Sequence, residues 1–281
     1  MTEGVLHERE VEPGTSGVRR ALPWLVGALL IALLAIFWAS TPAGILGKAD
    51  MLGYAVCHQI ESHSFVLSGR ALPLCARCTG TFIGAVVGLV GQVLVLRRRR
   101  AAGFPPVGIL AVLIGFTFLW AADGLNSYLA LIGGPHAYEP SNTLRLVTGS
   151  LNGLTMSSLI LPVVNISIWQ EPREVPAIRR VLDLVVLVVL EGVLVGLVLS
   201  GADWLLYPLS VLSGMAVLVL LASVNTVLAV VVAGHENSVE TWRQALLPFA
   251  VGLLLALLQV AAIDLVRYRL TGTLDGLPIV Q

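Results

Sequence analysis

The sequence has few charged residues, which make up 12% of its 281 residues. A soluble domain of this size carries about 25% charged residues, so this chain cannot cover a water-facing surface in the usual way. Basic and acidic side chains number 17 each, which gives a net charge of zero. The charge balance lacks the basic excess of proteins that bind nucleic acid, and we expect no nucleic-acid partner.

Several common catalytic motifs are also missing. The chain has no glycine-rich phosphate loop, no nucleophile elbow and no His-Glu-x-x-His zinc motif. Its single lysine, Lys48, lies outside every predicted span. The chain therefore lacks the lysine within a transmembrane helix to which a retinal-binding protein attaches its retinal. The three cysteines are an odd number, which excludes a fully paired disulfide framework.

Long apolar blocks dominate what remains. Hydrophobic residues make up 57% of the chain, and its mean hydropathy is +0.89. Such blocks predict transmembrane helices in a lipid bilayer, so the expected fold class is all-α, a polytopic membrane helix bundle. The alternative to seven spans is a six-span bundle that merges or drops a helix near residues 200–245. The seven expected spans cover residues 22–39, 79–96, 107–122, 144–169, 181–199, 207–233 and 245–263.

The predicted domain organisation is a tail over residues 1–20, a transmembrane bundle over residues 21–265 and a short tail over residues 266–281. Residues 40–77 form a long loop, with a short half-buried helix expected near its start. Residues 123–143 form a second polar loop on the same side of the membrane.

Basic residues predict the orientation, because they concentrate in cytoplasmic loops. With the N-terminus inside, the inner segments hold eleven basic residues and the outer segments six. The run Arg97–Arg100 is the largest inner group. We therefore expect a multi-pass protein of the plasma (inner) membrane, with a cytoplasmic N-terminus and both polar loops outside.

All three cysteines fall between Cys57 and Cys78, which indicates one local site. Thiolate and imidazole are preferred zinc ligands, and four of them complete a tetrahedral shell. The two-residue gap between Cys75 and Cys78 lets both sulfurs reach one ion, and Cys57 with His58 supplies the other half. These residues predict a site for zinc or a similar divalent metal, with His63 as the substitute for His58.

Two other interpretations of the cysteines stay open. Cys75 and Cys78 lie at the start of the second span, where the helix dipole and Arg77 lower a thiol pKa. On an oxidising outer face such a pair can act as a thiol–disulfide oxidoreductase that passes electrons to a lipid quinone, with Cys57 as exchange partner. The cluster can also be a structural staple in a transporter or an assembly subunit.

Polar residues gather in the second loop and at the start of the fourth span. Ser141 and Asn142 suit a helix cap, and Arg145 in the first turn can reach the headgroups. The functional interpretation pairs Asp123 with Arg145 beneath the cysteines. There they hold a lipid-like or small polar substrate, such as a phosphate headgroup, or orient the metal ligands. Asp123, Asn142 and Arg145 are the candidate catalytic residues.

Glu191 lies near the centre of the fifth span. An ionisable group at that depth costs at least about 2.5 kcal/mol, so it should face a partner or a water-filled cavity. Asn225 and Gln259, in the sixth and seventh spans, are the expected partners. The two interpretations are a helix–helix hydrogen bond and a proton or ion path.

Two groups of residues form a longer pattern over about residues 50–155. The first group is Cys57-His58-Gln59, Ser64-Phe65, Gly69 and Cys75-Ala76-Arg77-Cys78-Thr79-Gly80; the second is Asp123-Gly124, Ser141-Asn142, Arg145 and Thr148-Gly149. This pattern resembles that of an uncharacterised family of prokaryotic membrane proteins, domain of unknown function 2085. His63 departs from it, since the family has an arginine before the Ser-Phe pair. The resemblance implies a membrane protein with a Cys/His site and no established activity.

Overall fold

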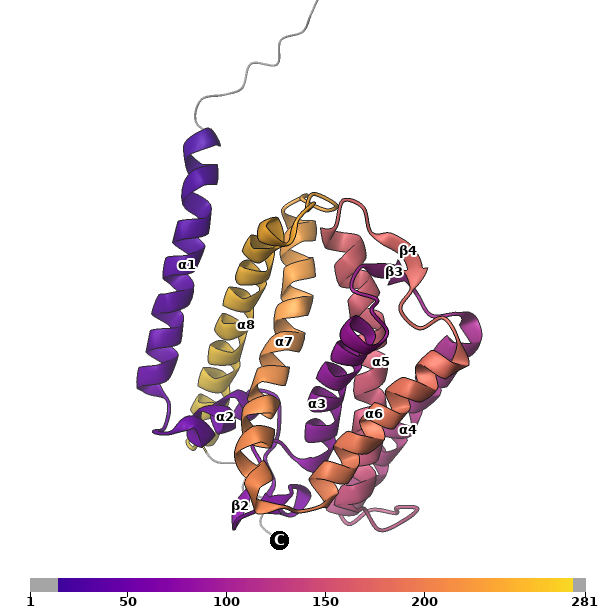
Figure 1. Cartoon of the computed structure of the whole chain (residues 1–281). Coiled ribbons are helices and arrows are strands. Elements are labelled where there is room, and N and C mark those ends of the chain that lie inside the picture. Colours follow the sequence, from indigo (N-terminus) through magenta and orange to yellow (C-terminus); the bar gives the residue numbers. More distant parts are fainter. Residues whose placement is uncertain (1–14, 275–281) are drawn as a thin grey trace, which may run out of the picture.

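A computed structural model describes residues 15–274, and over this range the chain is mainly helical (Figure 1). Seven of its helices are long and apolar enough to cross a membrane, which confirms the predicted all-α membrane bundle. The eight α-helices in this range are α1 (Thr15–Ser40), α2 (Ile45–Tyr54), α3 (Ala76–Val90), α4 (Val107–Leu131), α5 (Asn142–Ile168), α6 (Val181–Leu199), α7 (Leu206–Val232) and α8 (Trp242–Thr271).

Short elements connect these helices. A π-helical turn, η2 (Gly91–Val95), extends α3, and the 3-10 turns η1 (Glu61–His63) and η3 (Asp203–Leu205) lie in loops. The strands β1 (Val66–Leu67) and β2 (Arg70–Ala71) form a tight antiparallel hairpin, whose turn residue Gly69 has a φ of 73°. The strands β3 (Ala101–Gly103) and β4 (Arg173–Pro176) pair in parallel at the opposite end of the bundle.

Local chemistry sets several helix ends. The Ser141 hydroxyl accepts a hydrogen bond from the backbone N–H of Leu144 and caps α5. Thr241 and Gln244 form a reciprocal capping box at the start of α8. Gly272, in the left-handed conformation, ends α8.

Helices α4 and α8 continue well beyond the predicted ends of their spans. The prediction ended the third span at residue 122, whereas α4 continues through Asp123 and Asn126 to Leu131. The helix continues because an arginine neutralises Asp123, so its charge does not require a water-facing loop. The second polar loop is therefore confined to residues 132–141, and α8 likewise extends beyond the predicted end of its span to Thr271.

The ends of the predicted tails are also partly helical. Thr15–Arg20 form the first turns of α1, and residues 266–271 belong to α8. Residues 1–14 and 275–281 of these tails lie outside the described part of the chain.

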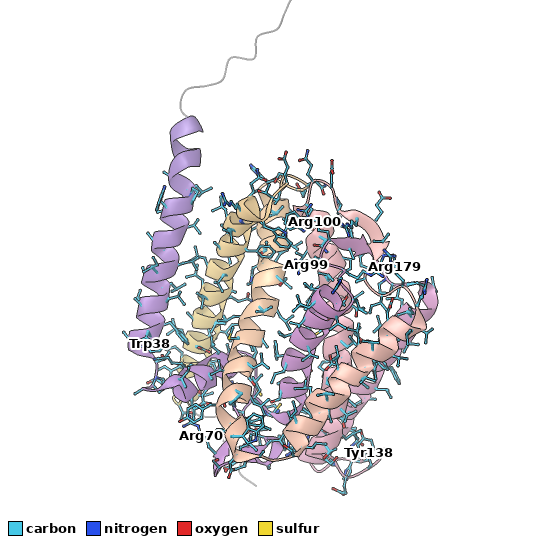
Figure 2. All side chains as sticks on the ribbon, in the orientation of Figure 1. Trp38, Arg70, Arg99, Arg100, Tyr138 and Arg179 are labelled. Atoms are coloured by element: carbon cyan, nitrogen blue, oxygen red, sulfur yellow. The ribbon has the colours of Figure 1, made fainter. Side chains whose placement is uncertain are left out.

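The loops gather at two opposite ends of the bundle (Figure 1). One end, called here the motif side, holds the segment 41–75, the loop 132–141 and the segment 200–205. The other, the arginine side, holds the start of α1 and the arginine run, and Figure 2 shows Arg99, Arg100 and Arg179 there, with Arg70 and Tyr138 at the motif side. The two polar loops therefore share one end of the bundle, as the seven-span topology predicts.

Helices α3 and α5 pack so closely that their backbones touch. Glycines follow one another every fourth residue on the α3 face, at Gly80, Gly84 and Gly88, and Gly149 and Gly153 face them from α5. A Cβ at Gly80 or Gly153 would collide with the backbone of the other helix. Small residues at this spacing allow close helix packing in membranes, and here they place the first turns of both helices side by side.

The remaining helices surround this pair. Helix α7 packs on α8 and on the short helix α2, and α1 contacts α8 with most of its surface exposed. Helix α2 confirms the predicted short helix in the long loop, and seven of its ten residues are buried. It therefore positions the segment that precedes Cys57.

Glu191 does not contact the partners predicted for it. The Asn225 side-chain amide donates to Oε1 of Gln259 at 3.0 Å, so these two residues satisfy one another. Glu191 is 1% exposed and lies against Gly84 of α3, and neither of its oxygens has a hydrogen-bond partner among the described residues. The prediction failed because it depended on helix rotation, which apolar composition does not reveal.

Candidate functional site

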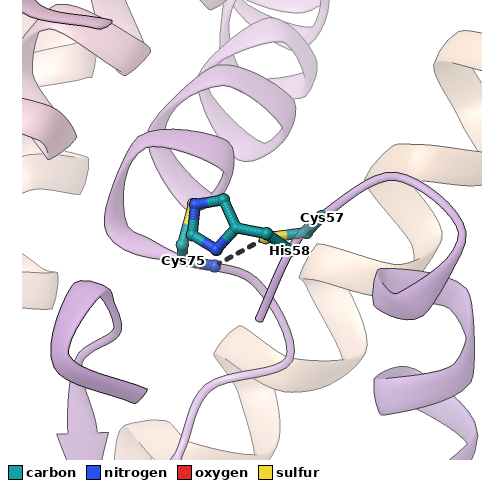
Figure 3. A group of neighbouring side chains, drawn as sticks. All are labelled: Cys57, His58 and Cys75. Carbon is teal, nitrogen blue, oxygen red and sulfur yellow. Dashed lines mark hydrogen bonds between the residues drawn. The ribbon is translucent and has the colours of Figure 1, made fainter. Parts of the chain in front are cut away.

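Three predicted metal ligands meet on the motif side. The ligand atoms of Cys57, His58 and Cys75 all lie within 4.8 Å of one another (Figure 3). Cys57 and Cys75 are buried, and Cys78 packs against them without joining the group of three. All three cysteines are free thiols. The structure therefore brings together the cysteines that the sequence separates by up to 21 positions.

Two backbone segments hold these sulfurs. Cys57 follows helix α2, whereas Cys75 is the N-cap of α3 and Cys78 lies in its first turn. The Cys57 sulfur accepts the backbone N–H of Cys75 at 3.2 Å, drawn in Figure 3, and that of Gln59 at 3.5 Å. Backbone donors that point at a sulfur stabilise negative charge on it, as metal-bound thiolates require.

The motif residue Gln59 ties the two segments together. Its side-chain amide donates to the carbonyl oxygens of Asp50 and Pro73, both at 2.9 Å. Its backbone has a φ of 51°, which is unusual for a residue with a side chain. Gln59 therefore fixes the distance between Cys57 and the start of α3.

Arg267 is a site residue that the sequence analysis missed. From α8, it donates to the carbonyl oxygens of Tyr54 and Cys57, and its guanidinium lies 3.9 Å from the centre of the Tyr54 ring. These contacts hold the end of α2 and the backbone of Cys57. The sequence signal was only an arginine near the motif-side end of the last span, which is also typical of a headgroup anchor.

The two histidines of the long loop lie next to each other. The rings of His58 and His63 are 5.4 Å apart in an edge-to-face arrangement. Nδ1 of His58 accepts the backbone N–H of Ile60 at 3.1 Å, so the neutral ring carries its proton on Nε2. Burial lowers the pKa of His63 to about 4, and the Arg145 guanidinium acts in the same direction. His63 is therefore a neutral ring at physiological pH.

The thiols differ in acidity. Hydrogen bonds from Cys57 and Cys78 lower the pKa of Cys75 far below its usual value. The same hydrogen bond to Cys75, together with burial, raises the pKa of Cys57 to about 12. Cys75 also lies at the positive end of the α3 dipole, which favours a thiolate at this position.

The predicted pair between Asp123 and Arg145 does not form, because Arg77 of α3 takes Asp123 instead. Nε of Arg77 donates to Oδ2 of Asp123 at 3.2 Å, and Nη2 also reaches this oxygen, the Asp123 carbonyl and the Ser127 hydroxyl. The Tyr138 hydroxyl donates to the other carboxylate oxygen at 3.0 Å. Both oxygens of Asp123 are thus occupied.

Arg145 instead contacts Asn142, one turn earlier in α5. Nη1 of Arg145 donates to Oδ1 of Asn142 at 2.8 Å. The Asn142 amide donates to the carbonyl oxygens of Ser62 and Ser64 at 3.1 and 3.3 Å. Asn142 therefore holds the loop that carries His63 against the start of α5. The cysteines and histidines thus lie in the same region as Arg77 and Arg145.

Replacing Asp123 by asparagine is expected to destabilise the protein strongly. The side chains of Arg77 and Asp123 are 17% and 2% exposed, and breaking a buried ion pair costs about 3–5 kcal/mol. Asp50→Asn is the matched control, because its partner Arg70 is also on the motif side and this pair is 46% and 35% exposed. An exposed pair contributes about 0–1 kcal/mol. Thermal unfolding in detergent measures both variants, and equal losses would contradict the prediction.

Comparison with known proteins finds two proteins that are similar to part of the chain. An uncharacterized protein of Methanocaldococcus jannaschii is 29% identical over 108 residues, which are 38% of this chain and 63% of that protein. An uncharacterized protein of Methanothermobacter thermautotrophicus is 28% identical over 104 residues, which are 37% of this chain and 83% of that protein. The matched region therefore spans less than two thirds of the first relative. No solved structure matches the chain.

A family model matches the part of the chain that holds the candidate site. It covers residues 57–159, which include all seven residues predicted for the site: Cys57, His58, Cys75, Cys78, Asp123, Asn142 and Arg145. The helices beyond this range lie outside the match. The family resemblance is thus confirmed for residues 57–159, which match the family described as "Predicted membrane protein (DUF2085)".

Proposed function

We propose that this membrane protein binds one zinc ion, or a similar soft-ligand divalent metal, at its Cys/His cluster. The observation that supports the proposal is the mutual distance of at most 4.8 Å between the ligand atoms of Cys57, His58 and Cys75. Cys78 lies against them and offers a fourth ligand. Sulfur and imidazole ligands in this number are typical of tetrahedral zinc.

The four ligands are not equivalent in this proposal. Cys57, Cys75 and Cys78 form the permanent part of the shell, and His58 is the exchangeable ligand. Its Nε2 binds a metal only after the proton moves to Nδ1, which requires the Ile60 N–H to leave Nδ1. A zinc with three protein ligands keeps a fourth position for water or substrate, so a site of this kind supports chemistry as well as structure.

The polar residues around the cluster complete the proposed site. Arg145 faces a lipid-like or small polar substrate, and Asp123 and Asn142 are positioning residues that hold Arg77 and the His63 loop. The proposed setting is the plasma membrane, with the motif side outside and the N-terminus in the cytoplasm. The excess of arginines on the opposite side of the bundle supports this orientation.

Elemental analysis of the purified protein, combined with thiol counting, tests the metal site. We expect about one zinc per chain, and thiols that alkylating agents reach only after a chelator removes the metal. His58→Ala should lower the zinc affinity by at least about tenfold, because the loss of even an outer-shell partner has an effect of this size. His136→Ala is the matched control, since this histidine lies in the loop 132–141 and its ring contacts Gly134 and Glu139 rather than the cluster.

Two results would overturn the metal proposal. A metal-free protein with a reducible bond between Cys75 and Cys78 would support the thiol–disulfide oxidoreductase instead. A metal-free protein that keeps its cellular activity after all three cysteines are replaced would indicate that the cluster has only a structural role.

A further inference from the structure

Arg145 is a buried cation without an acidic partner among the described residues. The residue is 6% exposed, and its Nε atom has no hydrogen-bond partner there. Its guanidinium donates instead to the neutral side-chain oxygen of Asn142. A buried charge is normally paired, because transferring it from water without compensation is costly.

The surrounding residues explain why Arg145 stays unpaired. Asp123 is the acidic residue predicted to pair with Arg145, and Arg77 and Tyr138 use both of its carboxylate oxygens. Arg77 thus has its counter-ion and Arg145 does not. The two guanidinium groups share one carboxylate, and Arg145 makes no direct contact with it, so the Arg145 guanidinium remains available to a ligand.

The position of Arg145 links that charge to the Cys/His cluster. Its charge acts on the His63 ring, and His63 in turn lies beside the metal-ligand candidate His58. Asn142 connects the same two parts, since it accepts from Arg145 and donates to the carbonyl oxygens of Ser62 and Ser64. Arg145 also lies in the first turn of α5, where the helix dipole favours an anion.

We infer that Arg145 binds a phosphate group beside the Cys/His cluster. A guanidinium presents two parallel N–H donors to phosphate oxygens, and its unpaired Nε is one of the donors of that fork. The inference rests on the proposed function for its role, because it assigns phosphate-bearing molecules as the substrate class of that site. Free phosphate compounds and phospholipid headgroups share this chemistry.

Binding of inorganic phosphate to the full-length protein in detergent tests the inference, with thermal shift and calorimetric titration as readouts. We expect saturable binding to the wild type, and a loss of affinity of about tenfold or more in Arg145→Ala. Arg145→Lys should also bind more weakly, because lysine keeps the charge and lacks the fork. Arg70→Ala, which removes an exposed arginine of the same side that is already paired with Asp50, should bind like the wild type.

Comparison of two preparations separates this inference from the metal proposal. Phosphate is titrated into zinc-loaded and into chelator-treated protein. Phosphate binding that depends on Arg145 and does not require zinc would support the inference even if the protein binds no metal. Zinc binding without any phosphate binding would do the reverse. Phosphatidylcholine nanodiscs with and without phosphatidic acid identify the source, because stabilisation by phosphatidic acid that Arg145→Lys abolishes indicates a lipid headgroup.

Three outcomes overturn the inference. They are no phosphate binding by the folded wild type, unchanged affinity in the Arg145 variants, and an equal response to acetate, which would indicate a site for any anion. If Arg145→Ala does not fold, the phosphate affinity of Arg145→Lys tests the inference in its place.

Discussion

Replacing Gly153 by valine is expected to prevent the bundle from assembling. A Cβ at this position would lie 2.6 Å from the backbone nitrogen of Ala85 and 3.0 Å from the carbonyl carbon of Gly84. These atoms belong to the backbone of α3, so no side-chain rotation relieves the collision, and α3 must move away from α5. Overpacking typically costs about 1–3 kcal/mol, and we expect a cost at or above the upper end of that range.

The yield of monodisperse protein and its melting temperature in detergent measure this effect. Gly192→Val is the matched control, because Gly192 also lies in a membrane-spanning helix and nothing lies within 4 Å of a Cβ added there. The control should keep the yield and melting temperature of the wild type. If Gly153→Val assembles as well as Gly192→Val, the close packing of α3 on α5 is wrong.

The spans were predictable because a bilayer imposes one simple requirement. Each crossing needs about 20 apolar residues, and this requirement appears directly in the composition of each segment. The predicted end of the third span was wrong for the same reason. An aspartate in an apolar sequence is expected to face water and to end the span. Here Asp123 pairs with Arg77, 46 positions away, and α4 continues to Leu131.

Pairings between helices were not predictable from composition. Arg77 and Arg145 were both available to Asp123, and the choice between them depends on how α3 and α5 rotate and how closely they approach. That approach depends on the glycines, whose regular spacing at Gly80, Gly84 and Gly88 is visible in the sequence but does not show which helix they face. The predicted partners of Glu191 were wrong for the same reason, since Asn225 and Gln259 bond to each other.

The candidate site was more predictable than its supports. Cys57, His58 and Cys75 converge as predicted from their close spacing in the sequence, whereas the fourth predicted ligand, Cys78, packs beside the group. Gln59 belongs to the same motif, but its role in tying Cys57 to the segment before α3 required the structure. Arg267 comes from the opposite end of the chain, and no local pattern links it to Cys57.

Replacing Cys75 by serine is expected to reduce the zinc content from about one ion per chain to nearly none. In the proposed metal site Cys75 is a ligand, since its sulfur is one of the three ligand atoms that converge there. Serine suits the N-cap position that Cys75 holds in α3, so the helix start is retained and the loss is specific to the sulfur. Metal binding contributes directly to stability, and the variant should melt at the temperature of chelator-treated wild type.

The dependence on chelator separates this effect from general damage to the fold. Elemental analysis and melting curves with and without chelator should show a shift in the wild type and no shift in Cys75→Ser. Cys57→Ser should behave alike, and the double variant should lose no more than either single variant, because residues that act through one ion are not additive. Zinc retained by Cys75→Ser, or an equal chelator shift in the variant and the wild type, would show that the ion binds elsewhere in the protein.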